Sequence, residues 1–358
     1  MRDFPLRFEP RPEPSRLMRY CSPLIAVGLT LIAGLILFSA LGKDPLQGFR
    51  LFFIQPIRNL YGLSELLLKA TPLMLCATGL AIGFRANVWN IGAEGQFILG
   101  AIGATGVALY FQGSGSAMLL PAMVLAGALA GAAWAAIPAL LRTHFNANEI
   151  LVSLMLVYVA QLYVSWLVFG PWRDRYGFGF PQTEMFSEAA LLPVILDGTR
   201  LHFGFVIALA LLATSYVFMQ HSYTGFKMRV AGEAAGAARY AGFSARRMIW
   251  IGLLCGGGAA GVAGMAEVAG PMGQLTDKVS FGYGFAAIIV AFVGRLHAFG
   301  IFLASLLMAL LFLGGEQVQQ YMNLPSSISM VFQGMLLFFL LGSDVFINYR
   351  LRFGRANA

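Results

Sequence analysis

The sequence predicts an all-α polytopic membrane protein with about ten transmembrane helices, two of them interrupted, and with both termini in the cytoplasm. Hydrophobic residues make up 58% of the chain, charged residues only 11%, and the mean hydropathy is +0.74. Soluble domains have a charged fraction of about 25%. A spanning helix needs about 20 residues, so 358 residues leave no length for a separate soluble enzyme domain.

Long apolar runs define the expected helices in order. The first run, residues 22–41, is too long for the apolar core of a signal peptide, so we expect an uncleaved span after a cytoplasmic segment, residues 1–21. The other expected spans are residues 64–83, 92–111, 118–141, 150–169, 203–219, 248–268, 282–293, 299–313 and 327–346. We therefore predict one transmembrane domain, residues 22–347, and a cytoplasmic tail, residues 348–358.

The positions of the basic residues predict the orientation of these spans. Cytoplasmic loops of membrane proteins carry an excess of Lys and Arg. With ten spans and an inside N-terminus, 16 of the 24 Lys and Arg fall inside. The remaining eight are Lys43, Arg50, Arg58, Lys69, Arg173, Arg175, Arg200 and Lys278. The distribution of the basic residues between the spans therefore predicts the membrane orientation. The net charge of +8 gives no support for nucleic-acid binding.

Small residues inside the expected spans predict close helix packing. Gly127 with Gly131, and Gly257 with Gly261, are spaced as in the small-xxx-small pattern that lets membrane helices approach closely. We assign these glycines no chemical role. The three Cys and four His are scattered along the chain, so we predict neither a disulfide framework nor a metal site.

The first interruption lies between the second and third spans. Residues 85–96 place two Asn, one Glu, one Gln and two Gly against apolar helices. Non-helical backbone at membrane depth is tolerated only where protein buries it or where it lines a cavity, and an intramembrane carboxylate is a functional candidate. Two interpretations of Glu94 stay open: it contacts the solute, or it braces the third helix, with Asn90 as the cap of that helix.

The second interruption is the segment Phe-Gly-Tyr-Gly-Phe at 281–285, which precedes an apolar run too short to span. Broken helices at corresponding positions of two helix sets are typical of a transporter binding site. We expect the two breaks to meet and to form a pathway lined by aromatic rings, which suit a base or a sugar ring. These rings are Trp89, Phe97, Tyr283 and Phe285.

The chain has no motif for its own chemistry. A P-loop, an HExxH zinc motif and a nucleophile elbow are all missing from the sequence, so we expect no catalytic residue and no bound cofactor. The longest cytoplasmic loop, residues 224–244, is Ala-rich and should form a short exposed helix over residues 233–240. This helix either docks on a separate ATPase subunit or is a solvated connector.

Several motifs together resemble the nucleoside and simple-sugar permeases of ABC importers, a branched-chain-type family that includes the ribose permeases. The first is Asn-Val-Trp-Asn-Ile-Gly-Ala-Glu-Gly-Gln at 87–96, and the second is Asn-Glu-Ile at 148–150. The others are the coupling loop from Gly225 to Gly242, the run at 282–297 and Gly-Gly-Glu at 314–316. The sequence departs from the family at Val88-Trp89, where relatives often carry Gly or Leu and Phe, and at Ala234-Ala235, where Asn-Pro is common.

The resemblance implies a division of roles. Partners would be an ABC ATPase subunit with two nucleotide-binding domains that uses ATP and Mg, a second and different permease chain, and an extracytoplasmic solute-binding protein, all at a bacterial inner membrane. The residues implied on or beside the solute pathway are Asn87, Trp89, Asn90, Glu94, Gln96, Phe97, Tyr283 and Phe285. Those implied in ATPase coupling are Phe226, Lys227, Arg229, Glu233, Arg239 and Tyr240.

The sequence therefore favours the permease subunit of an ABC importer that moves a small polar solute, with a nucleoside as first choice and a simple sugar such as ribose as the alternative. A secondary transporter with Glu94 or Glu267 as proton carrier remains a competing hypothesis. A membrane enzyme has no support, because no nucleophile, metal cluster or pair of catalytic carboxylates stands out. Which base or sugar is carried does not follow from these residues.

Overall fold

The structure, a computed structural model, describes residues 6–11, 15–177, 179–325 and 327–353. The expected terminal segments 1–21 and 348–358 therefore lie partly outside the described residues. The described chain divides into two compact units: one holds residues up to Arg58 and from Leu310 onward, and the other runs from Asn59 to Ala309. The predicted transmembrane domain, residues 22–347, extends over both units.

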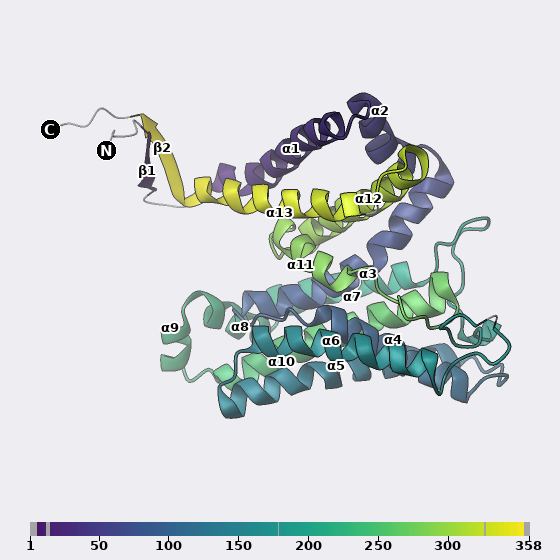
Figure 1. The fold of residues 1–358 in the computed structure, drawn as a ribbon. Coiled ribbons are helices and arrows are strands. Elements are labelled where there is room, and N and C mark those ends of the chain that lie inside the picture. The colour runs from purple at the N-terminus through teal and green to yellow at the C-terminus, as the bar shows by residue number, and fades with distance from the viewer. Residues whose placement is uncertain (1–5, 12–14, 178, 326, 354–358) are drawn as a thin grey trace. The chain divides into compact units, whose positions relative to one another are not determined.

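The first unit is built from the two ends of the chain. It holds β1 (Leu6–Pro10), α1 (Arg16–Ala40), α2 (Pro45–Phe49), a π-helical turn (Arg50–Ile54), a 3-10 turn (Gln55–Ile57), the end of α12 (Ala298–Met322), α13 (Ser327–Asn348) and β2 (Tyr349–Phe353). Strands β1 and β2 pair antiparallel beside the chain ends (Figure 1). Residues 6–10 and 349–353, from opposite ends of the sequence, therefore lie side by side.

Helices α1 and α13 pack against each other along the first unit. Ser22 Oγ and Ser343 Oγ are 2.9 Å apart, and Ser343 Oγ also donates to the Ser22 carbonyl at 3.1 Å. Phe332 stacks on Phe52 with ring centroids 4.4 Å apart, and Gly34 leaves room for the Phe332 ring. Apart from the β1–β2 ladder, the all-α prediction holds for the described residues of this unit.

The second unit contains most of the helices. They are α3 (Leu60–Arg85), α4 (Ala93–Tyr110), α5 (Leu119–Phe145), α6 (Glu149–Phe169), a 3-10 turn (Glu188–Ala190), α7 (Gly204–His221), α8 (Tyr223–Glu233), α9 (Ala235–Tyr240), α10 (Ala245–Glu267), a π-helical turn (Val268–Met272), α11 (Tyr283–Val293) and the start of α12. Helix α10 lies at the centre of this unit, packed against α3, α4 and α5.

Glycines bring α10 close to its neighbours. A Cβ added to Gly131 of α5 would lie 2.2 Å from the Gly257 carbonyl oxygen, and one added to Gly261 would lie 2.1 Å from the Gly127 carbonyl oxygen. The predicted tight crossings are thus confirmed, and the two glycine pairs face each other. Without side chains between them, the helix backbones gain dispersion contacts that lipid cannot supply.

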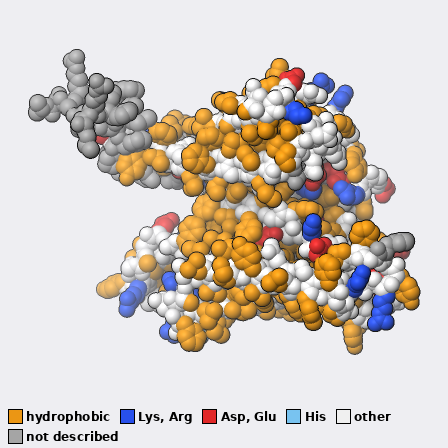
Figure 2. Space-filling model, in the orientation of Figure 1, with side chains coloured by type: hydrophobic (Ala, Val, Ile, Leu, Met, Phe, Trp, Pro, Cys, Tyr) orange, Lys and Arg blue, Asp and Glu red, His pale blue; other side chains and the backbone are white. Residues whose placement is uncertain are grey.

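Eight helices of the described chain are long and apolar enough to cross a membrane. They are Cys21–Ala40, Leu60–Arg85, Leu119–Phe145, Glu149–Phe169, Gly204–His221, Ala245–Met272, Ala298–Met322 and Met330–Ile347. Each of the ten predicted spans coincides with a helix, and the two that fall short of this criterion are α4 and α11, which follow the predicted interruptions. Hydrophobic side chains cover most of the visible face of each unit (Figure 2).

Candidate functional site

The two interrupted helices meet at their N-termini. Gly284, in the first turn of α11, packs directly on the backbone of α4, because an added Cβ would lie 2.2 Å from the Glu94 nitrogen. The Gly284 N–H donates to Glu94 Oε2 at 2.7 Å. A helix N-terminus carries a partial positive charge, so this buried carboxylate compensates two helix ends at once. The prediction that the two breaks meet is confirmed.

Asn90 and Gln96 form a buried amide pair beside this junction. Asn90 Nδ2 donates to Gln96 Oε1 at 2.8 Å, and Gln96 Nε2 donates back to Asn90 Oδ1 at 3.0 Å. Asn90 Oδ1 also accepts from the Gly92 N–H at 3.0 Å. Gly92, and not Asn90, is the N-cap residue of α4. The pair satisfies its own polar groups and braces the non-helical segment that leads into α4.

The aromatic residues predicted for the pathway fall into two groups. Phe97 and Tyr283 are fully buried, with ring centroids 6.0 Å apart, next to the junction. Phe285, two positions after Tyr283 in α11, is 38% exposed. In the observed conformation the Phe97 and Tyr283 rings are buried against protein and do not line an open channel.

Trp89 belongs to a separate stack at the C-terminal ends of α3 and α11. Its ring lies 5.2 Å from Phe84 and 5.7 Å from Phe292, and those two rings are 5.3 Å apart, centroid to centroid. Phe84 and Phe292 were not singled out from the sequence, because a Phe in an apolar run looks like any packing residue. Their positions, each one or two residues from a helix end, were the available signal.

Asn87 lies at the end of the second unit that carries α9 and the start of α10. Its backbone is left-handed, with φ of 56°, and its Oδ1 accepts from Trp89 Nε1 at 2.9 Å. It lines a cleft of about 550 Å³ together with Arg142, Glu149, Arg239, Phe243 and Arg246, among others. The Arg142 Nε and Glu149 Oε2 atoms are 3.2 Å apart. The structure thus separates Asn87 from the buried pair and places it beside the coupling loop.

The coupling loop folds into two helices instead of the single one predicted. Ala234, with φ of −144° and ψ of 74°, separates α8 from α9, and no side chain caps the start of α9. Phe226, Glu233, Arg239 and Tyr240 are exposed. Tyr240, the last residue of α9, is almost fully exposed, at 98%.

Lys227 and Arg229, both on α8, are partly buried. Lys227 Nζ lies 4.0 Å from the centre of the Tyr223 ring, a cation–π contact. Arg229 Nη1 donates to Gln220 Oε1, 3.2 Å away at the end of α7. The Arg229 contact joins α8 to the end of α7, whereas the Lys227 contact lies within α8.

The segment before α7 holds an ion pair and a buried histidine. Arg200 Nε and Nη2 donate to the two Glu65 oxygens at 3.0 and 2.5 Å. This hydrogen-bonded carboxylate raises the pKa of the Arg200 guanidinium. His202 Nδ1 accepts from the Gly204 N–H at 3.1 Å, and burial lowers the pKa of His202 to about 4. The loop before α7 is thereby fixed to the start of α3.

Comparison with known proteins decides the family. Residues 62–341 match the model of the branched-chain amino acid transport system permease component. The chain belongs to this family of ABC transporter permeases. It is therefore a non-catalytic, multi-pass membrane subunit of an ABC importer, which works with an ATPase and a binding protein. Because the chain belongs to this family, ATP hydrolysis is favoured as the energy source over the ion gradient of a secondary transporter.

Curated relatives of the permease differ in what their names say they carry. The permease is 36% identical to the glucose ABC transporter permease protein TsgB13 of Haloferax volcanii, over 97% of this chain and 93% of that one. It is 30% identical to the guanosine ABC transporter permease protein NupP of Bacillus subtilis, over 94% and 96%. It is 26% identical to the nucleoside permease NupB of Lactococcus lactis, over 89% of each chain. No solved structure matches the permease.

Proposed function

We propose that the permease imports a solute built on a sugar ring, with a nucleoside as the first candidate, by ATP-driven alternating access. The observation that carries this proposal is the junction of the α4 and α11 N-termini at Glu94, with buried aromatic rings beside it. Broken helices near the middle of a transporter typically mark its solute site. Aromatic faces and amide groups suit a nucleobase and its ribose.

Glucose is the second candidate. The relative with 36% identity is named a glucose permease, whereas the guanosine and nucleoside permeases match at 30% and 26%. A hexose also stacks an apolar ring face on aromatic side chains. The shared requirement is a sugar ring, and the nucleobase is the part that separates the two candidates.

A second, different permease chain is the partner proposed for this one. Three organisms each contribute two relatives, TsgB13 with TsgC13, NupP with NupQ, and NupB with NupC. In each organism one protein matches over at least 89% of this chain and the other over 74% or less. In each organism, therefore, one of the two permeases resembles this chain over more of its length than the other does. This difference supports a heterodimer in which this chain is the counterpart of TsgB13, NupP and NupB.

ATP and Mg are assigned to the partner ATPase, which we propose carries two nucleotide-binding domains and docks on the exposed residues of α8 and α9. The permease itself is proposed to bind no cofactor. The charge bias of the loops supports a cytoplasmic location for both termini, and the proposed location is the inner membrane of a bacterium.

The experiment is uptake by the whole importer. The permease is produced with the second permease, the ATPase and the binding protein encoded beside it, reconstituted into proteoliposomes, and supplied with labelled guanosine, uridine, ribose or glucose. Uptake of a nucleoside that requires ATP is the expected result. Preference for glucose would select the second candidate, and uptake without ATP or the ATPase would contradict the mechanism.

A further inference from the structure

Helix α11 is held at both ends by hydrogen bonds from distant parts of the chain. At its N-terminus Glu94 accepts from Gly284. At its C-terminus Arg85 Nε, at the end of α3, donates to the Leu296 carbonyl oxygen at 2.9 Å. The helix has 11 residues and is about 16 Å long. These two contacts therefore hold both ends of a short helix that begins at the Glu94 junction.

The Arg85 contact falls on a strained turn. Arg295 and Leu296, between α11 and α12, are both left-handed, with φ of 56° and 54°. Two adjacent non-glycine residues in this region cost free energy that the surroundings must offset. Close packing also constrains the turn, because a Cβ added to Gly300 would lie 2.1 Å from the Gly294 carbonyl oxygen. A strained, over-determined turn is a natural place for a two-state change.

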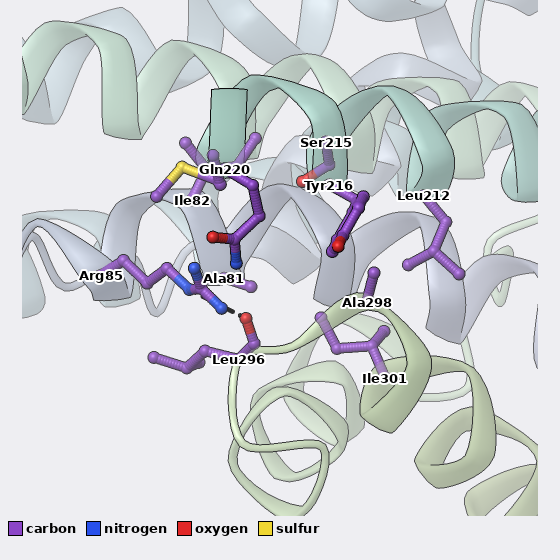
Figure 3. Close-up of a pocket in the computed structure, with 11 residues that line it drawn as sticks. Ala81, Ile82, Arg85, Leu212, Ser215, Tyr216, Gln220, Leu296, Ala298 and Ile301 are labelled. Atoms are coloured by element: carbon purple, nitrogen blue, oxygen red, sulfur yellow. Dashed lines mark hydrogen bonds between the residues drawn. The ribbon is translucent and has the colours of Figure 1, made fainter. Parts of the chain in front are cut away.

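Coupling helix α8 rests on the other side of Arg85. A Cβ added to Gly232 would lie 2.1 Å from the Arg85 carbonyl oxygen, so the two backbones touch without an intervening side chain. Arg229, also on α8, donates to Gln220, and Gln220 lies beside Arg85 in Figure 3. A displacement of α8 therefore reaches Arg85 directly.

Little empty space separates these groups. The cavity in Figure 3, lined by Arg85, Tyr216, Gln220, Leu296 and others, has a volume of about 20 Å³, room for about one water. In the figure the Arg85 guanidinium points at the Leu296 carbonyl, with its hydrogen bond drawn. A close-packed contact transmits a displacement because it has little free volume to absorb it.

We propose that Arg85 is a positioning residue that transmits movement of coupling helix α8 to α11, through the turn at Arg295 and Leu296. When α8 moves with the ATPase, the Arg85 hydrogen bond pulls this turn between two arrangements. Helix α11 then shifts at the Glu94 junction, next to which the Phe97 and Tyr283 rings are buried. The proposal rests on the proposed function, since it requires an ATPase that moves α8.

The test uses the complete importer in proteoliposomes. Arg85→Met removes the donor but keeps the side-chain length, and Gly232→Ala forces α8 away from Arg85. Gly258→Ala on α10, away from the proposed ATPase docking surface, is the matched control, because its added Cβ would make only ordinary contacts, the nearest at 3.7 Å. Exposed Arg247→Met controls for the loss of one cytoplasmic charge. Both test variants should keep ATP hydrolysis but lose uptake by about tenfold or more, a coupling energy of ordinary size.

Hydrogen exchange separates transmission from a merely structural effect. In the wild-type importer, nucleotide binding should change exchange both in α8 and in residues 291–297. In Arg85→Met the change in α8 should remain and the change in 291–297 should disappear, with partial rescue in Arg85→Lys, which retains a donor. Coupled uptake in both test variants, or a retained response at 291–297, would overturn the assignment. A wild-type importer without ATP-driven uptake would instead refute the proposed function.

Discussion

The backbone N–H of Gly284 donates a hydrogen bond to Glu94 Oε2, 2.7 Å away, across the point where the α4 and α11 helices begin. The two residues are 190 positions apart in sequence. The contact explains how a buried carboxylate is held between apolar helices. The Glu94 oxygen serves as the acceptor for an N–H in the first turn of α11, which has no partner within its own helix.

Two replacements of Glu94 should test whether it stabilises the protein by accepting the Gly284 hydrogen bond at the start of α11. Glu94→Ala leaves the buried Gly284 N–H without an acceptor and should lower the free energy of unfolding by about 1–3 kcal/mol. Glu94→Gln keeps an acceptor oxygen and should lose less. Thermal unfolding of the detergent-solubilised permease measures both. Equal losses in the two variants would contradict the capping role.

Two glycines on α10 should respond differently to alanine. In Gly261→Ala the new Cβ would meet the Gly127 carbonyl oxygen at 2.1 Å, so we expect a loss of roughly 1–3 kcal/mol from overpacking. Gly258→Ala, whose nearest neighbour lies 3.7 Å away, should be neutral or slightly stabilising. Unfolding temperature and the yield of monodisperse protein provide the measurement. A similar loss in both would show that close packing is not the cause.

His202 should make the permease sensitive to acid. Its pKa is lowered from 6.5 to about 4, so the folded state keeps the ring neutral while the unfolded chain binds a proton below about pH 6.5. Stability is therefore complete above that pH and falls between pH 6.5 and 4, by about 2 kcal/mol at pH 5. His202→Asn cannot be protonated and should lose less stability between pH 7 and 5. Identical pH profiles would refute this cause.

The exposed charges of the coupling loop should matter for the ATPase and not for folding. Glu233 and Arg239 are both exposed. Their joint replacement by Ala should leave the unfolding temperature unchanged but abolish solute-stimulated ATP hydrolysis by the assembled importer. Co-purification of the ATPase reports whether docking itself is lost. Normal stimulation in the double variant would place the coupling contact elsewhere.

Hydropathy was sufficient to predict where the helices lie, because each span must be apolar over its whole length. It could not predict which face of a helix meets protein, since lipid and protein interior are both apolar, and so Phe84 and Phe292 looked ordinary. The polar residues were more informative: Glu94, Asn90 and Gln96 are costly in hydrocarbon, and all three proved to be buried at the junction.

Contacts between segments that are distant in the chain could not be predicted from the sequence. Nothing near Arg85 indicates that its partner is a carbonyl more than 200 residues later, and the Ala-rich sequence around Ala234 favours a helix and gives no sign of the break there. The helical turns between residues 45 and 57 were likewise not predicted. The meeting of α4 and α11 could be predicted only from the general behaviour of broken helices.

Pairing of β1 with β2 and packing of α1 against α13 have a consequence for biosynthesis. Helix α1 leaves the ribosome first, and its partner is made last. At about 5–20 residues per second, α1 must wait about 15–60 s in the membrane before α13 exists. During that interval Ser22 lacks its Ser343 partner, so the first helix of this permease must remain stable alone in lipid until translation ends.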